Sequence, residues 1–284
     1  MQDLNRILRI KLLTMLQKIN ETARFLIEKY GNKAKIAIVL GSGLNDLCQD
    51  IEIKQAISYA GIPNFPLSTV VGHEGNLLFG KLNGVDIVVM QGRFHYYEGY
   101  DMKQITFPIR VLKAMGIETL ILSNASGGVN PNFHIGDIMM ITDHINLFPE
   151  HPLRGKNEDM LGDRFPDMSE AYSKILLQKA EQIAQKHAIP YQKGVYVGTQ
   201  GPTFETPAEY KMFRILGGDC VGMSTVPEAI VAHHAKMNCI AFSIITDLGV
   251  EGMVEKVSHE EVLNAAIVAE PKLRLIVKEL VKVI

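Results

Sequence analysis

Short apolar runs alternate with amphipathic segments along most of this chain. Continuous apolar runs bounded by polar or turn residues are typical of buried strands. Residues 36–40 form such a run, and strands are also expected at residues 77–82, 85–91, 119–123, 138–147, 195–197 and 239–246. Apolar residues at helical spacing predict helices over residues 4–30, 103–115, 169–187, 207–216, 226–237 and 258–280. Alternating strands and helices indicate an α/β fold with a mostly buried central sheet.

Turn and cap residues set the expected boundaries of these elements. Asn83-Gly84 between two apolar runs is the strongest short hairpin signal, and it predicts a mixed sheet instead of a purely parallel one. Ser169 is the expected N-cap of one helix, and Pro207 the expected first residue of another. Pro271 predicts a break within the last helix.

Composition excludes several classes of protein. Hydrophobic residues make up 47% and charged residues 21% of the 284 residues, which suits a globular chain and not a disordered one. The formal net charge is −2 and no dense block of Lys or Arg occurs, so we expect no nucleic-acid partner. The apolar runs are far shorter than the roughly 20 residues of a spanning helix, so we expect no membrane insertion.

Neither an internal repeat nor a flexible linker divides the chain. We therefore expect a single α/β domain over residues 1–284, in which residues 1–34 form an N-terminal helical segment. Charged residues interrupt the apolar positions at the N-terminus, so a signal peptide is not expected. Cys48, Cys220 and Cys239 have no Cys-x-x-Cys spacing and suit small buried residues in a reducing compartment. These features predict a cytoplasmic protein without disulfides or a zinc site.

Two turns of small residues are expected directly after buried strands, at residues 41–43 and 125–128. Glycine-rich turns at the carboxyl ends of strands expose backbone N–H groups, which bind anions. For either segment alone, a tight turn without any ligand is the simpler interpretation. The first turn matches neither a dinucleotide fingerprint nor a P-loop nor a nucleophile elbow, so Ser42 suits a phosphate-holding hydroxyl better than a nucleophile.

Two histidines and an arginine are further candidates for anion ligands. His73 and His95 lie in glycine-flanked loops, and Arg93 follows a predicted strand. Each of them alone is also compatible with a purely structural role. His233 and His234 are adjacent in a predicted helix and point to different faces, so we interpret them as surface or packing residues and expect no metal site.

An aromatic residue stands beside an acid in the loop of residues 200–206, as Phe204 and Glu205. Such a pair can stack on a flat heterocycle and accept hydrogen bonds from its edge. The alternative is an ordinary helix entry, in which Glu205 stands near the N-terminal end of the helix that begins at Pro207. The residues alone do not separate these two interpretations.

Taken together, these segments resemble the trimeric, low-molecular-mass class of purine nucleoside phosphorylase, from about residue 36 to the C-terminal helix. The motifs that carry the resemblance are Gly-Ser-Gly-Leu at 41–44, Ile-Pro-Asn-Phe-Pro at 62–66, Gln-Gly-Arg-Phe-His-Tyr-Tyr-Glu-Gly-Tyr at 91–100, Asn-Ala-Ser-Gly-Gly at 124–128, Asp-His-Ile-Asn-Leu at 143–147, Gly-Asp-Arg-Phe-Pro at 162–166 and Gly-Met-Ser-Thr-Val-Pro-Glu at 222–228. The resemblance implies a partly barrel-like mixed sheet flanked by helices, and a homotrimer. It also implies a reaction of purine salvage, in which phosphate displaces a purine base from C1′ of a nucleoside.

The resemblance also implies roles for individual residues, matched motif by motif. Phosphate would be held by Ser42, His73, Arg93, His95, Ala125, Ser126 and Ser224. Ribose would be held by Tyr97, Met223 and His259, and by Phe165 of a neighbouring subunit. The purine would be held by Phe204, Glu205 and Asp247, and the catalytic set would be His95, Glu205 and Asp247. No metal or resident cofactor is implied, because inorganic phosphate is a co-substrate.

One residue departs from the pattern of the resemblance. Asp247 stands where members specific for 6-oxopurines usually place Asn. We expect this Asp to broaden the enzyme toward 6-aminopurines, while Glu205 keeps 6-oxopurines preferred through their N1–H. Two alternatives stay open: a methylthioadenosine phosphorylase, whose members carry Asp there, and a catalytically dead nucleoside-binding regulator. Glu205 and the Met-Ser-Thr sequence at 223–225 favour the nucleoside enzyme over the first alternative.

Overall fold

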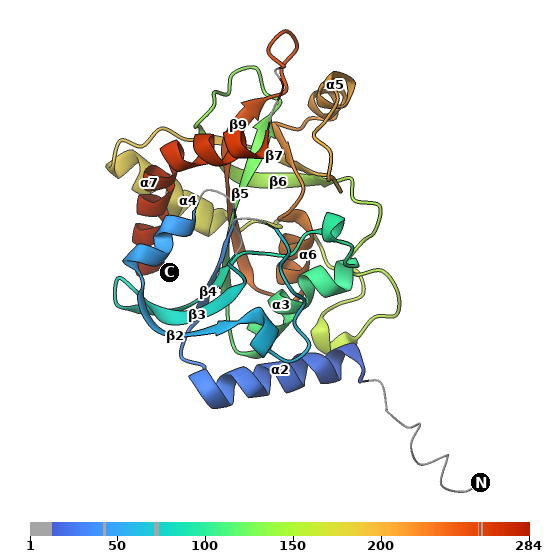
Figure 1. Ribbon diagram of the computed structural model, residues 1–284, viewed down its shortest axis with the longest axis vertical. Helices are drawn as coiled ribbons and strands as arrows, with labels where there is room; N and C mark the ends of the chain where they lie inside the picture. Colours follow the sequence, from blue (N-terminus) through green and yellow to red (C-terminus); the bar gives the residue numbers. More distant parts are fainter. Residues whose placement is uncertain (1–12, 42–43, 71–73, 255, 257) are drawn as a thin grey trace, which may run out of the picture.

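The structure, a computed structural model, describes residues 13–41, 44–70, 74–254, 256 and 258–284, without the side chain of residue 259. Its strands are β1 (Ile36–Leu40), β2 (Glu52–Ser58), β3 (Asn76–Leu82), β4 (Val85–Gln91), β5 (Thr119–Gly128), β6 (Ile138–Asn146), β7 (Gln192–Gly198), β8 (Cys220–Gly222) and β9 (Asn238–Leu248). Its α-helices are α2 (Met15–Tyr30), α3 (Met102–Ala114), α4 (Lys174–Lys186), α5 (Pro207–Ile215), α6 (Val226–His234) and α7 (His259–Val283). Figure 1 shows α4 and α7 on one side of the sheet, and α3 and α6 on the other.

The strands form one mixed sheet that closes partly on itself. Within the described residues its order is β2-β3-β4-β1-β5-β8-β7-β6-β9, and β9 pairs with β5 as well. This extra pairing closes the strands from β5 to β9 into a ring, so the expected α/β fold with a partly barrel-like mixed sheet is confirmed. β4, β1, β5 and β9 run parallel to one another. Their carboxyl ends therefore meet at one edge, where α/β proteins bind ligands.

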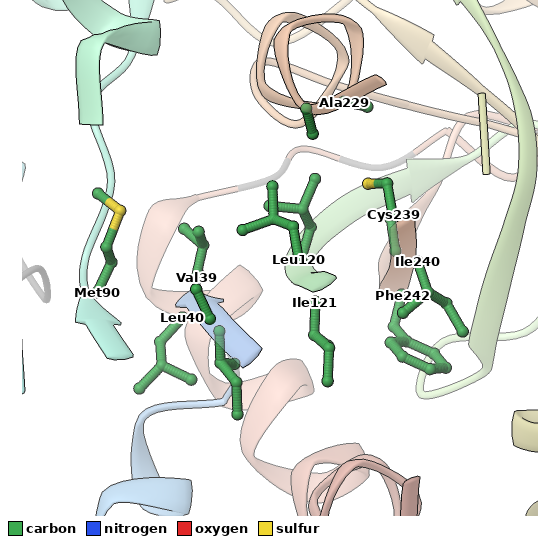
Figure 2. Close-up of a cluster of buried hydrophobic side chains, with 14 of the residues drawn as sticks. Val39, Leu40, Met90, Leu120, Ile121, Ala229, Cys239, Ile240 and Phe242 are labelled. Atoms are coloured by element: carbon green, nitrogen blue, oxygen red, sulfur yellow. The ribbon is translucent and has the colours of Figure 1, made fainter. Parts of the chain in front are cut away.

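Apolar side chains of the parallel strands form the core, as Figure 2 shows. Val39, Leu120 and Ile240 come from three neighbouring strands and are all fully buried. Ala229 of α6 lies over one face of these strands (Figure 2), and α7 packs against β9. Because both faces are covered, these strands have continuous apolar sequences with no polar alternation.

Several predicted elements are confirmed. The hairpin between β3 and β4 turns at Asn83 and Gly84, whose φ angles of 51° and 82° are the positive values that a type I′ turn requires. The strand at residues 36–40 is β1, and the helices expected at 103–115 and 207–216 are α3 and α5, each within one residue at either end. Residues 4–12 of the first expected helix lie outside the described residues, and α2 accounts for residues 15–30. Leu13 and Thr14 are not helical, contrary to expectation, because Thr14 is the N-cap of α2.

The turn predicted at residues 125–128 is wrong, because these residues continue strand β5. They pair with β9 on one side, and Gly127 and Gly128 also pair with β8 on the other. Their small side chains serve close packing: a Cβ on Gly127 would lie 2.8 Å from the Asp247 Oδ2 atom. The small residues therefore let another side chain approach the strand, and they do not mark its end.

The start of the helix predicted at residues 169–187 is also wrong. α4 begins at Lys174, and the side chain of Ser173 caps it by accepting a hydrogen bond from Leu176 N. Ser169 instead donates its backbone N–H to Asp167 Oδ1, at 2.9 Å, in the loop before the helix. Both serines have the N-cap residue type, and the local sequence does not choose between them.

The break predicted at Pro271 does not occur, since α7 continues through it as one helix of 25 residues. Leu273, Ile276 and Leu280 beyond the proline are fully buried. Burying three such side chains contributes about 1.5–3 kcal/mol each, which together exceeds the roughly 3 kcal/mol penalty of an internal proline.

The sequence did not predict β2 or β8, because β2 is an almost fully exposed edge strand and β8 has only three residues.

All three cysteines lie within the described residues. Cys220 and Cys239 are buried strand residues, as expected, whereas Cys48 is only half-buried. None of the three is joined in a disulfide. Among the helices described, none combines the length and the apolar character that crossing a membrane requires.

Candidate active site

One cavity lies at the edge where the carboxyl ends of the parallel strands meet. Its lining residues are Arg93, His95, Tyr97, Asn124, Ala125, Ser126, Gly127, Phe204, Glu205, Val221, Gly222, Met223, Ser224, Thr246, Asp247 and Val262. They come from β5, β8, β9 and α7, from the loops that follow β4 and β8, and from the loop that precedes α5. The topology therefore brings together residues that lie far apart in the sequence.

Arg93 is fixed inside the protein by an ion pair with Glu228. Its Nε donates to Glu228 Oε1 at 3.2 Å, and its Nη2 lies 2.9 Å from Oε2. Arg93 is 1% exposed and Glu228 is 5% exposed. Glu228 stands in the first turn of α6, so the start of this helix sets the plane of the guanidinium group. A buried charge held in this way is a suitable ligand for an anion.

Gly41, directly after β1, is a glycine that this arginine requires. A Cβ on Gly41 would lie 2.2 Å from Ser123 O and 2.6 Å from Arg93 Nη1. Arg93 Nη1 donates to Ser123 O, and Gly41 N donates to Ser123 Oγ at 3.1 Å. Arg93, Gly41 and β5 are therefore packed as one unit. Ser42, which the sequence assigned to phosphate, lies outside the described residues.

His95 is paired with an acid three residues further along the chain. Its Nδ1 lies 3.2 Å from Glu98 Oε1, and Thr69 donates to Glu98 Oε2 through both N and Oγ1. Burial lowers the pKa of His95 below its ordinary value, although the hydrogen bond with Glu98 opposes this. Burial raises the pKa of Glu98, but the hydrogen bonds from His95 and Thr69 outweigh it and bring the value to about 2. An ionised Glu98 beside a neutral imidazole places the ring proton on Nδ1 and leaves Nε2 as an acceptor.

A chain of polar side chains runs beneath the cavity from β5 to the loop after β8. Ser126 Oγ lies 2.6 Å from Ser243 Oγ, which donates to Asn124 Oδ1 at 2.6 Å. Asn124 Nδ2 donates to Thr225 Oγ1 at 2.7 Å, and Thr225 Oγ1 lies 3.1 Å from Ser224 Oγ. Because the Thr225 oxygen accepts from Asn124, its own proton can go to Ser224. The Ser224 hydroxyl is then able to donate to a bound anion.

Two acids, Glu205 and Asp247, also line the cavity. Burial raises the pKa of Glu205 to about 7, and the charge of Asp247 contributes to the rise. Burial also raises the pKa of Asp247, against hydrogen bonds from Thr246 and Tyr210. Two carboxyls in one poorly solvated cavity resist joint ionisation, so the pair retains a proton more readily than either group would alone.

Asp247 is held by hydroxyl groups on both oxygens. Thr246 Oγ1 donates to Oδ1 at 3.1 Å, and Tyr210 Oη donates to Oδ2 at 3.2 Å. The tyrosine ring needs a glycine beside it, because a Cβ on Gly249 would lie 2.2 Å from its Cδ1 atom. The carboxyl therefore has a defined orientation toward a ligand in the cavity.

Apolar surfaces complete the lining. The ring of Tyr97 stacks on that of His95, with 4.7 Å between centroids and 13° between planes. Met223 packs against Gly201, where a Cβ would lie 2.2 Å from the Met223 Sδ atom. Phe204 is 43% exposed, so its ring remains accessible for stacking on a flat ligand.

The residues that the sequence assigned to the site have three outcomes. Ten of them line this one cavity: Arg93, His95, Tyr97, Ala125, Ser126, Phe204, Glu205, Met223, Ser224 and Asp247. His73, like Ser42, lies outside the described residues, and so does the side chain of His259, the first residue of α7. Phe165 is not part of the lining and is 86% exposed.

Sequence reasoning missed the residues that hold the lining side chains in place. Glu228, Glu98 and Tyr210 do not line the cavity, yet each contacts a residue that does. A signal for Glu228 exists, since it is an acid within the apolar stretch 226–232 and a buried acid needs a partner. A signal for Glu98 is its spacing of three residues from His95, which is typical of a capping contact.

His233 and His234, which the sequence indicates are surface or packing residues, do not line the cavity. His234 Nδ1 lies 2.8 Å from Arg110 Nη1, and His233 Nε2 lies 2.6 Å from Asp167 O. Both are packing contacts to neighbouring loops and helices. Across the described ranges, no three His, Cys, Asp or Glu side chains are grouped so that they could hold a metal ion.

Comparison with known proteins agrees with the geometry. The model of the phosphorylase superfamily matches residues 35–282. A relative from Geobacillus stearothermophilus, purine nucleoside phosphorylase 1, is 52% identical over 246 residues, which cover 87% of this chain and 90% of the relative. Among solved structures, a schistosoma purine nucleoside phosphorylase in complex with hypoxanthine is 37% identical with a TM-score of 0.88, and the match covers 95% of this chain and 98% of that chain. The Schistosoma mansoni enzyme in complex with adenosine matches with the same identity, coverage and TM-score.

The range of the family model, residues 35–282, includes all ten assigned residues of the cavity. This chain belongs to the phosphorylase superfamily and, within it, to the purine nucleoside phosphorylases.

Proposed function

We propose that this protein cleaves purine nucleosides by phosphorolysis. A phosphate oxygen bonds to C1′ of the ribose, the bond from C1′ to the base nitrogen breaks, and its electron pair leaves with the base. The products are ribose 1-phosphate and a free purine. The family membership supports this reaction, which makes the protein a glycosyltransferase-type enzyme.

The observation that carries the proposal is the chemical division of one cavity. One group of lining residues contains a desolvated arginine and a hydroxyl donor, which suit an anion, and a neutral histidine, which can accept a proton from it. The other group contains two acids of raised pKa, which suit the hydrogen-bonding edge of a heterocycle. A reaction that joins phosphate to a sugar and releases a base needs both groups in one cavity.

At the phosphate end, the residues of this chain act by positioning. Arg93 supplies charge in a fixed plane, and Ser224 supplies a hydroxyl donor. Ser126, whose proton goes to Ser243, and the Ala125 backbone belong to the same proposed set. Phosphate is already an anion near neutral pH, so it needs orientation more than activation. His95, kept neutral by burial and oriented by Glu98 at Nδ1, accepts a proton from the phosphate or from a ribose hydroxyl through Nε2. Ser42 and His73 belong to the same proposed set.

At the sugar, Tyr97 and Met223 provide the contact surface, and His259 is proposed to reach the 5′-hydroxyl. The sugar gains positive charge as the bond to the base lengthens. A phosphate dianion held against it stabilises that charge electrostatically. The departing base gains negative charge in the same step, and a proton donor at its N7 stabilises it.

At the base, Glu205 and Asp247 are the recognition groups, and Phe204 stacks on the ring. An ionised Glu205 accepts the N1–H of a 6-oxopurine, while a protonated Asp247 donates to N7. Inosine and guanosine are therefore the preferred substrates. Asp247 adds adenosine as a further substrate, because its carboxylate accepts from a 6-amino group, and the related Schistosoma mansoni enzyme is known in complex with adenosine.

The active assembly is proposed to be a homotrimer in which Phe165 covers the sugar of a neighbouring subunit. Phe165 is 86% exposed and Met160 is 83% exposed, both in the long connection between β6 and α4. Two large apolar side chains this exposed suit burial against another copy. The Arg164 guanidinium lies 5.5 Å from the Phe165 ring centroid and supports it from its own chain.

A second candidate is methylthioadenosine phosphorolysis, and Asp247 is the observation that favours it. This residue type is the one expected beside a 6-aminopurine, whereas Glu205 is the one expected beside a 6-oxopurine. The two activities also differ at the 5′ position, where one substrate carries a hydroxyl and the other a methylthio group. Competition between inosine and methylthioadenosine for the same enzyme therefore separates the two functions.

We further propose a cytoplasmic location, no resident cofactor and a metal-independent reaction, with inorganic phosphate as co-substrate. Three cysteines outside any disulfide support a reducing compartment. Neither membrane nor nucleic acid is proposed as a partner, since the ligands are small molecules.

The experiment is phosphorolysis of inosine, guanosine, adenosine and methylthioadenosine side by side, with and without phosphate. Base release from inosine that depends on phosphate supports the proposal. Base release at the same rate without phosphate shows a hydrolase, and binding of nucleosides without turnover shows a regulator. Arg93→Ala should raise the phosphate KM, because it removes the charge proposed to hold phosphate. Arg274→Ala is the matched control, because Arg274 forms an ion pair with Asp50 outside the cavity.

A further inference from the structure

Thr225, which stands between Ser224 and helix α6, has an unusual backbone conformation. Its φ angle is 64° and its ψ angle is −52°. Val226 N donates to Ser224 O at 2.6 Å across it, so these three residues form the rare, strained kind of γ-turn. A positive φ is unfavourable for a β-branched residue, and such strain persists only where the surroundings enforce it.

The surroundings of Thr225 enforce this conformation. The residue is fully buried, at 0% exposure. Its Oγ1 accepts from Asn124 Nδ2 at 2.7 Å, and its carbonyl oxygen accepts from Ala229 N at 2.9 Å in the first turn of α6. Thr225 is the N-cap of α6, yet its side chain makes no capping hydrogen bond to the helix. The hydroxyl group is therefore directed to Asn124 and Ser224 and not to the helix.

The proton of the Thr225 hydroxyl group has one acceptor in the part of the chain that the structure describes. Thr225 Oγ1 contacts Asn124 Nδ2, which is a donor, and Ser224 Oγ, which lies 3.1 Å away. An amide nitrogen does not accept hydrogen bonds, so the buried proton goes to Ser224 Oγ. Arg93 Nη1 lies 3.5 Å from the same oxygen as a second donor. With two donors facing its oxygen, Ser224 directs its own proton into the cavity that it lines.

The turn also sets the position of Ser224 relative to Arg93. Glu228, three residues after Thr225 in the first turn of α6, lies 2.9 Å from Arg93 Nη2 through its Oε2. Thr225 therefore joins one proposed phosphate ligand, Ser224, to the helix that holds the other. With an ordinary negative φ, the chain would not reverse between Ser224 and Val226, and the serine would leave its place beside the guanidinium group.

We propose that Thr225 is a positioning residue for phosphate, whose strained turn and hydroxyl group fix Ser224 Oγ as a donor toward phosphate bound beside Arg93. The inference rests on the proposed function. Thr225 is fully buried and is not part of the cavity lining, so it does not touch the phosphate. The contribution of its hydroxyl group to phosphate binding therefore passes through Ser224 alone.

Thr225→Val is the direct test, because it removes the hydroxyl group and keeps the β-branched shape. Ser224 then loses its buried donor, and its own hydroxyl group is free to turn away from phosphate. A hydrogen bond to a charged ligand is the strong kind, so the phosphate KM should rise about tenfold. The inosine KM at saturating phosphate should hardly change. Thr225→Ser retains the hydroxyl group and should have nearly the wild-type phosphate KM.

A double-mutant cycle tests whether Thr225 acts through Ser224. Ser224→Ala removes the group that Thr225 positions, and it should raise the phosphate KM at least as much as Thr225→Val does. Adding Thr225→Val to Ser224→Ala should cause no further rise, because the positioned group is already absent. An effect transmitted through Asn124 or through the fold would instead add to that of Ser224→Ala.

Thr22→Val is the matched control. Thr22 is also a fully buried threonine, and it accepts from Asn64 Nδ2 at 3.2 Å and donates to Pro63 O at 2.8 Å, outside the cavity. Its loss should lower the thermal midpoint and leave the phosphate KM unchanged. Calorimetric titration with inorganic phosphate, without nucleoside, measures binding in the absence of turnover. Thr225→Cys, in which a weaker donor replaces the hydroxyl group, serves the same comparison if the valine variant does not fold.

The outcomes separate this inference from the proposed function. A wild type that cleaves inosine with phosphate, together with an unchanged phosphate KM in Thr225→Val, overturns the inference and leaves phosphorolysis standing. Effects of Thr225→Val and Ser224→Ala that multiply in the double variant also overturn it, since Thr225 then does not act through Ser224. A wild type that releases no base from any nucleoside in the presence of phosphate overturns the proposed function itself.

Discussion

Replacing Arg93 should weaken phosphate binding and the fold together, and a second substitution should separate the two effects. Arg93→Met removes the guanidinium group and leaves the carboxylate of Glu228 at 5% exposure without its partner. Breaking a buried ion pair on one side costs about 3–5 kcal/mol of stability. Loss of a charge-assisted hydrogen bond to phosphate costs about 1.5–3 kcal/mol, so the phosphate KM should rise about 10- to 150-fold.

The double variant Arg93→Met/Glu228→Leu replaces the ion pair with two apolar side chains of similar size. Replacing both partners of a buried pair is often close to neutral for stability, so most of the lost free energy of unfolding should return. The phosphate KM should not return, because neither of the two new side chains carries a positive charge. Urea unfolding in phosphate-free buffer measures the first effect, and initial rates at varied phosphate and saturating inosine measure the second.

Two results would refute the reasoning. An unchanged phosphate KM in Arg93→Met would remove the arginine from the phosphate site. A phosphate KM that recovers together with stability in the double variant would show that Arg93 acts only by supporting the fold. Arg274→Met is the control, since Arg274 forms ion pairs with Asp50 and Glu270 outside the cavity.

Three further predictions concern the base, the neighbouring subunit and pH. Asp247→Asn should lower adenosine kcat/KM at least tenfold and maintain or improve that of inosine, because an amide donates to N7 without a proton from solution; equal losses for both nucleosides would contradict this. Phe165→Ala should raise the nucleoside KM several-fold without changing the phosphate KM, and the wild type should sediment as a trimer; a fully active monomer would disprove the assignment. The raised pKa of Glu205, about 7, marks the pH at which the pair of acids loses its last proton. Inosine and adenosine kcat/KM should therefore both fall as pH increases above about 7, and a rate that still increases at pH 9 would exclude a required proton.

The strands and helices of the core could be predicted because burial on both faces leaves a continuous apolar run. β1 is the clearest case, as five buried residues end at Gly41. The carboxyl end of β5 could not be predicted, because Gly127 and Gly128 have turn composition but pair with β8 and β9. β2 could not be predicted either, since an exposed edge strand has no apolar alternation. In both cases, pairing with strands distant in the sequence overrides the local pattern.

The candidate site could be predicted where a residue lies in a long motif, as Arg93 and His95 do. The residues behind the site could not, since their roles arise from contacts between distant segments. Glu228 reaches Arg93 across 135 positions of sequence, and Tyr210 reaches Asp247 across 37. No local pattern records such contacts, although the acid within the apolar start of α6 indicates that some partner must exist.

The central claim is that phosphate, bound beside Arg93, is the nucleophile at C1′. Phosphorus NMR of the reaction of inosine with phosphate tests it most directly, with hypoxanthine measured in the same sample. One equivalent of ribose 1-phosphate should form for each hypoxanthine released, and no hypoxanthine should appear in phosphate-free buffer. Free ribose in place of ribose 1-phosphate, with base release unchanged when phosphate is omitted, would contradict the claim.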